Sequence, residues 1–206
     1  MSKVQRARDR RAAAQRAEAE RRSRLRRNLW LAFAVVLAAV AMVAVGLATL
    51  IGQDDEGEPG AVRGEQIFQG LDRGQVQTRV DYAQTPPVGG DHFPVWQNCG
   101  FYDAPVPSGT GVHSLEHGAL WITYRPGLPA DQVAALRSLA GSQSFVLASP
   151  LRDLPAPVVA SAWGVQLPLD DADDPRLDEF VRAYRMGPQT PEPGAPCTGG
   201  FGRPAA

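Results

Sequence analysis

The longest apolar segment of the chain runs from residue 29 to residue 51 and contains no charged side chain. A helix rises about 1.5 Å per residue, so a helix of this length can cross the hydrocarbon core of a bilayer, which is about 30 Å thick. The pattern therefore predicts a transmembrane helix over residues 29–51. A cleaved signal peptide is the alternative, although its apolar core is shorter, about 7–15 residues, and ends in a small-x-small cleavage site.

After residue 61 the pattern changes to short segments typical of strands in a globular domain. Residues 76–82 alternate apolar and polar side chains, the period of two expected of a half-buried strand. Residues 119–124, 144–149 and 158–163 are short apolar segments rich in β-branched or aromatic residues. We expect a strand in each of these four segments.

Two further segments predict helices. Residues 129–140 place apolar side chains at helical spacing and are followed by Gly141, and residues 174–187 begin with Asp-Pro, a pair typical of a helix start. Residues 85–111 contain five prolines and five glycines and predict an irregular loop. Together the elements predict an α+β fold, with a small, mainly antiparallel sheet, two helices on one face and long Pro/Gly-rich loops.

Charge is distributed unevenly along the chain. Residues 1–27 hold 11 of the 21 basic residues and three acidic ones, a net charge of +8, whereas the rest of the chain carries −9. Basic flanks stay on the cytoplasmic side of a membrane, so we expect the N-terminus inside and the domain outside the cell membrane. The predicted organisation is a basic cytoplasmic segment (1–28), a transmembrane helix (29–51), an acidic linker (52–61), an extracytoplasmic α+β domain (62–201) and a tail (202–206).

These segments also predict partners. Residues 29–51 would contact the lipid bilayer, and residues 2–27 would lie against anionic lipid headgroups. Nucleic-acid binding by the basic segment is the alternative for its charge. No aromatic side chain for base stacking precedes Trp30, however, so we expect no nucleic acid as a partner.

The three histidines of the chain, His92, His113 and His117, fall close together in sequence. Neutral imidazole binds zinc and copper well, so the three form a candidate metal site, and their nitrogens should then lie about 3–4 Å apart. Glu116 would hold a histidine ring in place or serve as an alternative ligand. The competing interpretation is that the imidazoles donate hydrogen bonds to carbonyl groups of the irregular loop.

The string from His113 to His117 has the H-x-x-E-H pattern of a class of zinc peptidases, in which a helix presents the ligands. A strand expected from residue 119 leaves little room for such a helix, and we expect a turn there instead. Among the remaining side chains no complete catalytic set is visible, which argues against an enzyme.

Cys99 and Cys197 are the only cysteines, and both follow the predicted transmembrane helix. An oxidising compartment favours disulfides, so we predict a Cys99–Cys197 bridge. The alternative is a free Cys99 thiolate that acts as a metal ligand or nucleophile beside the histidines.

Several rare strings occur together in a fixed order. They are TPPVGGDH (85–92), WQNCGFY (96–102), VHSLEHG (112–118), SAWG (161–164) and GPQTPEPGAPC (187–197). With them, the region of residues 62–201 resembles the bacterial domain-of-unknown-function family 3105. The resemblance implies a single-pass membrane protein with an extracytoplasmic domain of unassigned function. It suggests that the three histidines, both cysteines and Glu116 occupy motif positions.

These observations favour a binding or interaction module of the cell envelope, with an envelope protein or a cell-wall component as its partner. A zinc- or copper-binding domain is the alternative. An unrecognised hydrolase with a histidine as general base is a second alternative.

Overall fold

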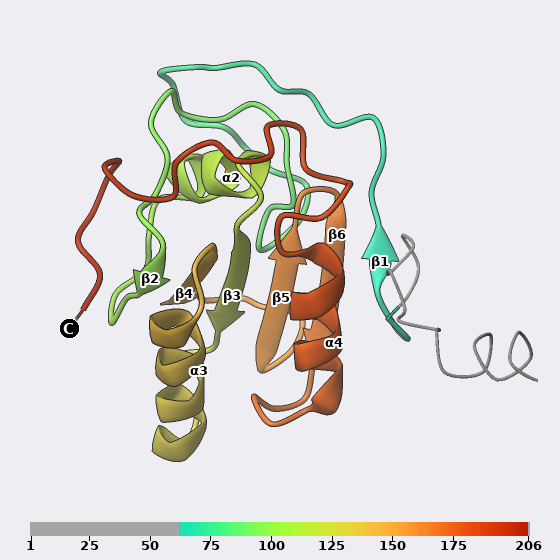
Figure 1. Cartoon of the computed structure of the whole chain (residues 1–206), viewed down its shortest axis with the longest axis vertical. Helices are drawn as coiled ribbons and strands as arrows, with labels where there is room; N and C mark the ends of the chain where they lie inside the picture. Colours follow the sequence, from blue (N-terminus) through green and yellow to red (C-terminus); the bar gives the residue numbers. More distant parts are fainter. Residues whose placement is uncertain (1–61, 206) are drawn as a thin grey trace, which may run out of the picture. The chain divides into compact units, whose positions relative to one another are not determined.

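The computed structural model describes residues 62–205, and its elements are shown in Figure 1. In chain order they are β1 (Gln66–Ile67), β2 (Gly100–Phe101), α2 (Ser108–Glu116), β3 (Leu120–Tyr124), α3 (Ala130–Ser142), β4 (Val146–Pro150), β5 (Val158–Ala162), β6 (Val165–Leu169) and α4 (Pro175–Tyr184). The predicted α+β class is confirmed.

The strands form one six-stranded sheet in the order β1-β6-β5-β3-β4-β2. Strand β4 is parallel to both β3 and β2, whereas the other neighbouring pairs are antiparallel. The sheet is therefore mixed: three of its five neighbouring pairs are antiparallel, as predicted for most of the sheet, and β4 adds two parallel pairs that were not predicted. The physical reason is α3, because a helical connection carries the chain back far enough for β4 to start at the same edge as β3.

Alternation along β3 divides the core between the two faces of the sheet. Leu120 and Ile122 pack with the apolar sides of α3 and α4, so these two helices cover one face, as predicted. Trp121 points to the opposite face and packs with Val112 and Leu115 of α2. The candidate site lies on the α2 side of the sheet.

Helix α2 lies in a region where we expected a loop and then a turn, so that expectation is wrong. The described residues contain three helices instead of two. Two of its glycines are required by packing, because a Cβ on Gly109 would meet the Phe93 ring at 2.9 Å and one on Gly111 would meet Trp121 at 2.7 Å. The glycines that suggested irregular backbone therefore let α2 approach its neighbours closely.

The predicted strand at residues 76–82 is also wrong. The described structure shows only an isolated bridge next to it, between Gln75 and His92. Val76 and Val80 are partly exposed, and no neighbouring strand is available to pair with this segment. An alternating pattern without a partner strand does not form sheet.

Residues 185–205 follow α4 as an irregular tail that returns along α2, as Figure 1 shows. Within residues 62–205, no helix has the length and apolar character needed to cross a bilayer. The predicted cytoplasmic segment (1–28), transmembrane helix (29–51) and linker (52–61) lie outside the described residues.

Candidate metal site

Helix α2 and the loop before it bring the candidate ligands together. His113 and Glu116 lie on α2, and His117 follows as its C-terminal cap. Side chains three or four residues apart on a helix are neighbours, so these three share one region of its surface. Gly118, with a φ of +96°, then ends the helix. His92 comes from the preceding loop.

Each of the three imidazoles is held by a main-chain carbonyl through its Nδ1 atom. His92 Nδ1 lies 2.9 Å from the Gly90 oxygen and His113 Nδ1 lies 2.6 Å from the Phe93 oxygen. His117 Nδ1 lies 2.7 Å from the oxygen of Pro196 in the tail. A carbonyl only accepts, so each Nδ1 carries the proton and donates it. In the neutral rings, each Nε2 is then a lone-pair acceptor, the form that binds metals.

The closest polar contact of the site joins His92 and Glu116. His92 Nε2 lies 2.9 Å from Glu116 Oε2, and the two side chains are 0 and 5 % exposed. Despite this distance, His92 Nε2 has no hydrogen-bond partner of acceptable geometry. An imidazole lone pair and a carboxylate oxygen repel each other, and a proton or a cation placed between them removes this repulsion.

The rings form a continuous row. The centroids of His92 and His113 are 4.8 Å apart, and those of His113 and His117 are 4.6 Å apart. One ligand atom from each of His92, His113 and Glu116 falls within 4.8 Å of the other two. Ligand atoms around a tetrahedral zinc ion are about 3.3 Å apart, so binding would draw this set together by about an ångström or more. We call these three residues the inner set.

The surroundings of the row favour the neutral form of His113. Burial lowers the pKa of His113, and the nearby His117 and His92 rings lower it further, while the hydrogen bond to the Phe93 carbonyl and the charge of Glu192 oppose the change. A neutral imidazole is the species that coordinates a metal ion. The indole of Trp96 lies 5.9 Å from the His113 ring and 5.2 Å from the His117 ring and flanks the row.

Comparison with known families places this site in context. The family model DUF3105, described as a protein of unknown function, matches residues 74–199. The chain belongs to the DUF3105 family. This match confirms the resemblance inferred from the sequence, and the matched range contains every candidate ligand and both cysteines. Comparisons with curated proteins and with solved structures find no match.

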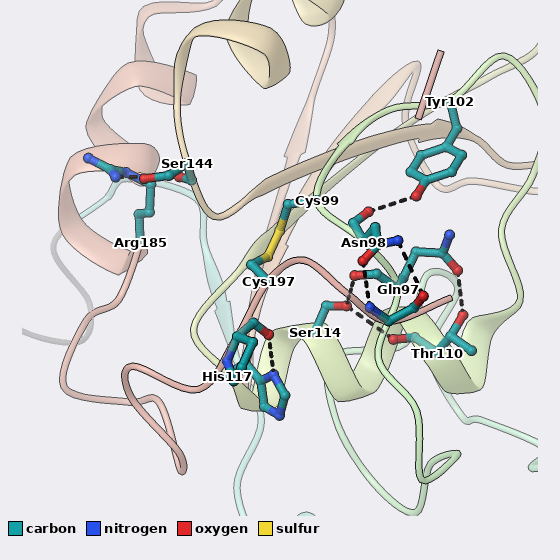
Figure 2. The surroundings of a disulfide bond; sticks show 12 residues. Gln97, Asn98, Cys99, Tyr102, Thr110, Ser114, His117, Ser144, Arg185 and Cys197 are labelled. Carbon is teal, nitrogen blue, oxygen red and sulfur yellow. Dashed lines mark hydrogen bonds between the residues drawn. A yellow bond between two sulfur atoms is a disulfide. The ribbon is translucent and has the colours of Figure 1, made fainter. Parts of the chain in front are cut away.

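A disulfide ties the tail of the DUF3105 domain to the segment before α2. Cys99 and Cys197 are bonded, as predicted, and their Cα atoms are 5.4 Å apart. Figure 2 shows the bridge together with His117, whose ring bonds to the residue just before Cys197. Because both sulfurs are used in the bridge, Cys99 offers no thiolate to the site in this state.

The segment that contains Cys99 is fixed along α2 by further bonds, also drawn in Figure 2. Thr110 Oγ1 donates to Gln97 Oε1 at 2.7 Å, and Ser114 Oγ donates to the Gln97 carbonyl at 2.8 Å. The side-chain amide of Asn98 donates to the tail at Gly202 at 2.6 Å. The tail is thus held in place around the bridge by polar contacts as well.

The DUF3105 domain brings all three predicted histidines together, but the inner set contains Glu116 where we named His117. The competing interpretation also describes part of the structure, because His92 and His113 bond to carbonyls of the irregular loop. Two features of the tail were missed from the sequence. One is the Pro196 carbonyl that holds His117, and the other is Glu192, whose Oε2 lies 4.0 Å from His117 Nε2. The signal for Glu192 was its position five residues before Cys197, since the predicted disulfide would bring this part of the tail close to Cys99.

Proposed function

We propose that the DUF3105 domain of this chain binds one transition-metal ion, zinc or copper, through His92, His113 and Glu116. The observation that carries the proposal is the buried contact between His92 Nε2 and Glu116 Oε2 at 2.9 Å. A cation between these two atoms removes their repulsion, and His113 adds a third ligand atom within 4.8 Å. Imidazoles combined with a carboxylate suit zinc and copper, whereas magnesium and calcium prefer oxygen ligands alone.

The burial of the inner set favours holding an ion over catalysis. His92 is 0 % exposed, and His113 and Glu116 are each 4 % exposed. Three protein ligands leave a fourth coordination position to water, as in catalytic zinc sites, so it is the burial of the set and not its ligand count that favours holding an ion. Glu116 also contacts His92 directly, so it is not free to act as the general base that the H-x-x-E-H peptidases require. We therefore favour metal binding over hydrolysis.

We further propose that the domain acts outside the cell membrane, anchored by residues 29–51. The support is the uncharged segment 29–51 with eleven basic residues before it. Alkaline phosphatase fused after residue 206 should be active, because it folds only after export. An inactive but intact fusion would reverse the orientation.

Metal binding is tested on the full chain in detergent micelles, stripped with a chelator and then dialysed against zinc or copper. We expect about one equivalent of tightly bound metal by elemental analysis. The informative variants are His92→Asn and His113→Asn, because an asparagine amide can still donate to the carbonyl that Nδ1 contacts but offers no Nε2 ligand. Each variant should lower the metal affinity at least tenfold and leave the circular dichroism unchanged.

Glu179→Gln is the matched control, since Glu179 is an exposed carboxylate on α4. It should bind metal like the wild type. If the wild-type chain retains no metal, or if the two histidine variants bind it equally well, the proposal is wrong and the carbonyl contacts alone explain the histidines.

A second candidate function, an envelope-binding module, is favoured by a separate cavity of about 610 Å³. Its lining includes Tyr82, Phe93, Val106 and Pro107, mostly from the Pro/Gly-rich loop. This volume is within the range of small-ligand pockets. If the cavity binds solubilised cell-wall fragments, they should slow amide hydrogen exchange at Tyr82, Phe93 and Val106, and unchanged exchange would count against this function.

A further inference from the structure

We infer that Glu192 and His117 form an outer metal position through which an ion reaches the buried inner set. This inference rests on the proposed function and assigns a role to the two groups that the inner set leaves out. Glu192 is 57 % exposed, whereas His117 is 4 % exposed. The ring of His117 in turn lies against His113, a member of the inner set. Ligand groups therefore lead without a break from solvent to the buried carboxylate of Glu116.

The fold fixes the backbone of Glu192, which keeps its exposed carboxylate within reach of His117. Its main-chain N–H donates to the Glu116 carbonyl at 3.0 Å, at the end of α2. Four residues later, the Pro196 carbonyl accepts the Nδ1 proton of His117. Cys197 then ties the tail to Cys99. The tail thus places the Glu192 carboxylate beside His117 Nε2, the ring nitrogen that remains free to bind a metal.

The separation between the two groups suits an ion better than a direct contact. Glu192 Oε2 and His117 Nε2 are 4.0 Å apart, which is too far for a hydrogen bond. Zinc–nitrogen and zinc–oxygen bonds are each about 2.0–2.2 Å long and tetrahedral ligands lie about 3.3 Å apart, so the exposed Glu192 side chain needs to move inward by about 0.7 Å to share a cation with His117. With only two protein ligands and water completing its coordination, such a position exchanges its ion readily.

The inner set has the opposite properties, because it offers three ligand groups that are almost completely buried. An ion that passes from His117 to His113 exchanges water ligands for protein ligands. The outer position should therefore control how fast metal enters and leaves, and the inner set should control how tightly it is held.

The test uses the full chain in detergent micelles, with Cu²⁺ as the probe and quenching of tryptophan fluorescence as the signal. Trp96 lies beside the His113 and His117 rings and reports on loading. Glu192→Gln should slow copper binding roughly tenfold, which is the lower end of the rate increase that charged groups at the entrance of a site give to association. It should slow removal of copper by a chelator by the same factor, so that the dissociation constant changes less than twofold.

Two further variants make the result specific. His117→Asn keeps a donor for the Pro196 carbonyl and should slow both rates like Glu192→Gln. Glu179→Gln removes the same charge from the far helix α4 and should change neither rate.

Each possible result has a separate meaning. Unchanged rates in Glu192→Gln would overturn the outer position and leave the proposed metal site intact. A dissociation constant weakened as much as in Glu116→Gln would make Glu192 a ligand of the tightly bound ion, which also overturns this inference. A wild-type chain that binds no copper or zinc would overturn the proposed function itself.

Discussion

Replacing Glu116 with glutamine should stabilise the metal-free protein, although Glu116 is a buried residue in close contact with a histidine. Glutamine has nearly the same shape, and its side-chain N–H can donate to His92 Nε2, which has no other hydrogen-bond partner. One such bond contributes about 1 kcal/mol. Removal of the buried carboxylate should contribute about another 1 kcal/mol, because desolvating a charge is costly.

The expected gain of about 2 kcal/mol corresponds to a rise in melting temperature of about 4–8 °C for a domain of this size. Zinc, in contrast, should stabilise the variant less than it stabilises the wild type. Zinc at a hundred times the wild-type dissociation constant stabilises the wild type by about 2.7 kcal/mol. If the variant binds a hundredfold more weakly, the same zinc concentration stabilises it by only about 0.4 kcal/mol.

The assay is urea unfolding of the full chain in detergent micelles, followed by tryptophan fluorescence, first with a chelator and then with zinc. Glu179→Gln serves as the control and should match the wild type under both conditions. A lower free energy of unfolding for metal-free Glu116→Gln would refute the reasoning. It would mean that Glu116 and a protonated His92 form an ion pair that supports the fold.

Three other changes test the structure around the site. Replacing both disulfide cysteines with serine should lower the free energy of unfolding by about 4–5 kcal/mol, because the bridge spans 98 residues; an unchanged urea midpoint would contradict this. Gly111→Ala should lower the free energy of unfolding by about 1–3 kcal/mol, because the added Cβ would meet Trp121 at 2.7 Å. Gly141→Ala, whose Cβ would meet no atom within 4 Å, should not lower it when both variants are compared by thermal unfolding. Burial raises the pKa of Tyr82 to about 12, so the difference spectrum against Tyr82→Phe should titrate there, and stability should fall as the pH rises from 10 through 12; a midpoint near 10 would argue against its burial.

The sequence predicts best the elements whose stability is local or that lie in the core. Strands β3, β4 and β5 and helices α3 and α4 agree with the predictions to within a few residues, because each carries an apolar pattern matched to its burial. Strand β6 was missed since Pro168 interrupts its pattern. The neighbouring strand β1 pairs only with Val165 and Gln166, so Pro168 lies where β6 has no partner on that side.

The candidate site was partly predictable for a different reason. Clustering of His92, His113 and His117 in sequence was enough to propose that they meet, because α2 and the loop before it are adjacent along the chain. The contact of His117 with Pro196 spans 79 residues and no local pattern encodes it. Helix α2 could not be predicted from the sequence either, because its glycines are explained only by their close packing against Phe93 and Trp121.

The tail that encloses the histidine row has a consequence for the order in which the site is built. Residues 188–201 are synthesised after every strand and helix of the domain, yet they supply the carbonyl that orients His117 and the carboxylate of Glu192. The inner set, in contrast, comes from residues 92–116 alone. During biosynthesis the chain can therefore bring the inner set together before the tail is made, and the Cys99–Cys197 disulfide then fixes Pro196 and Glu192 beside His117.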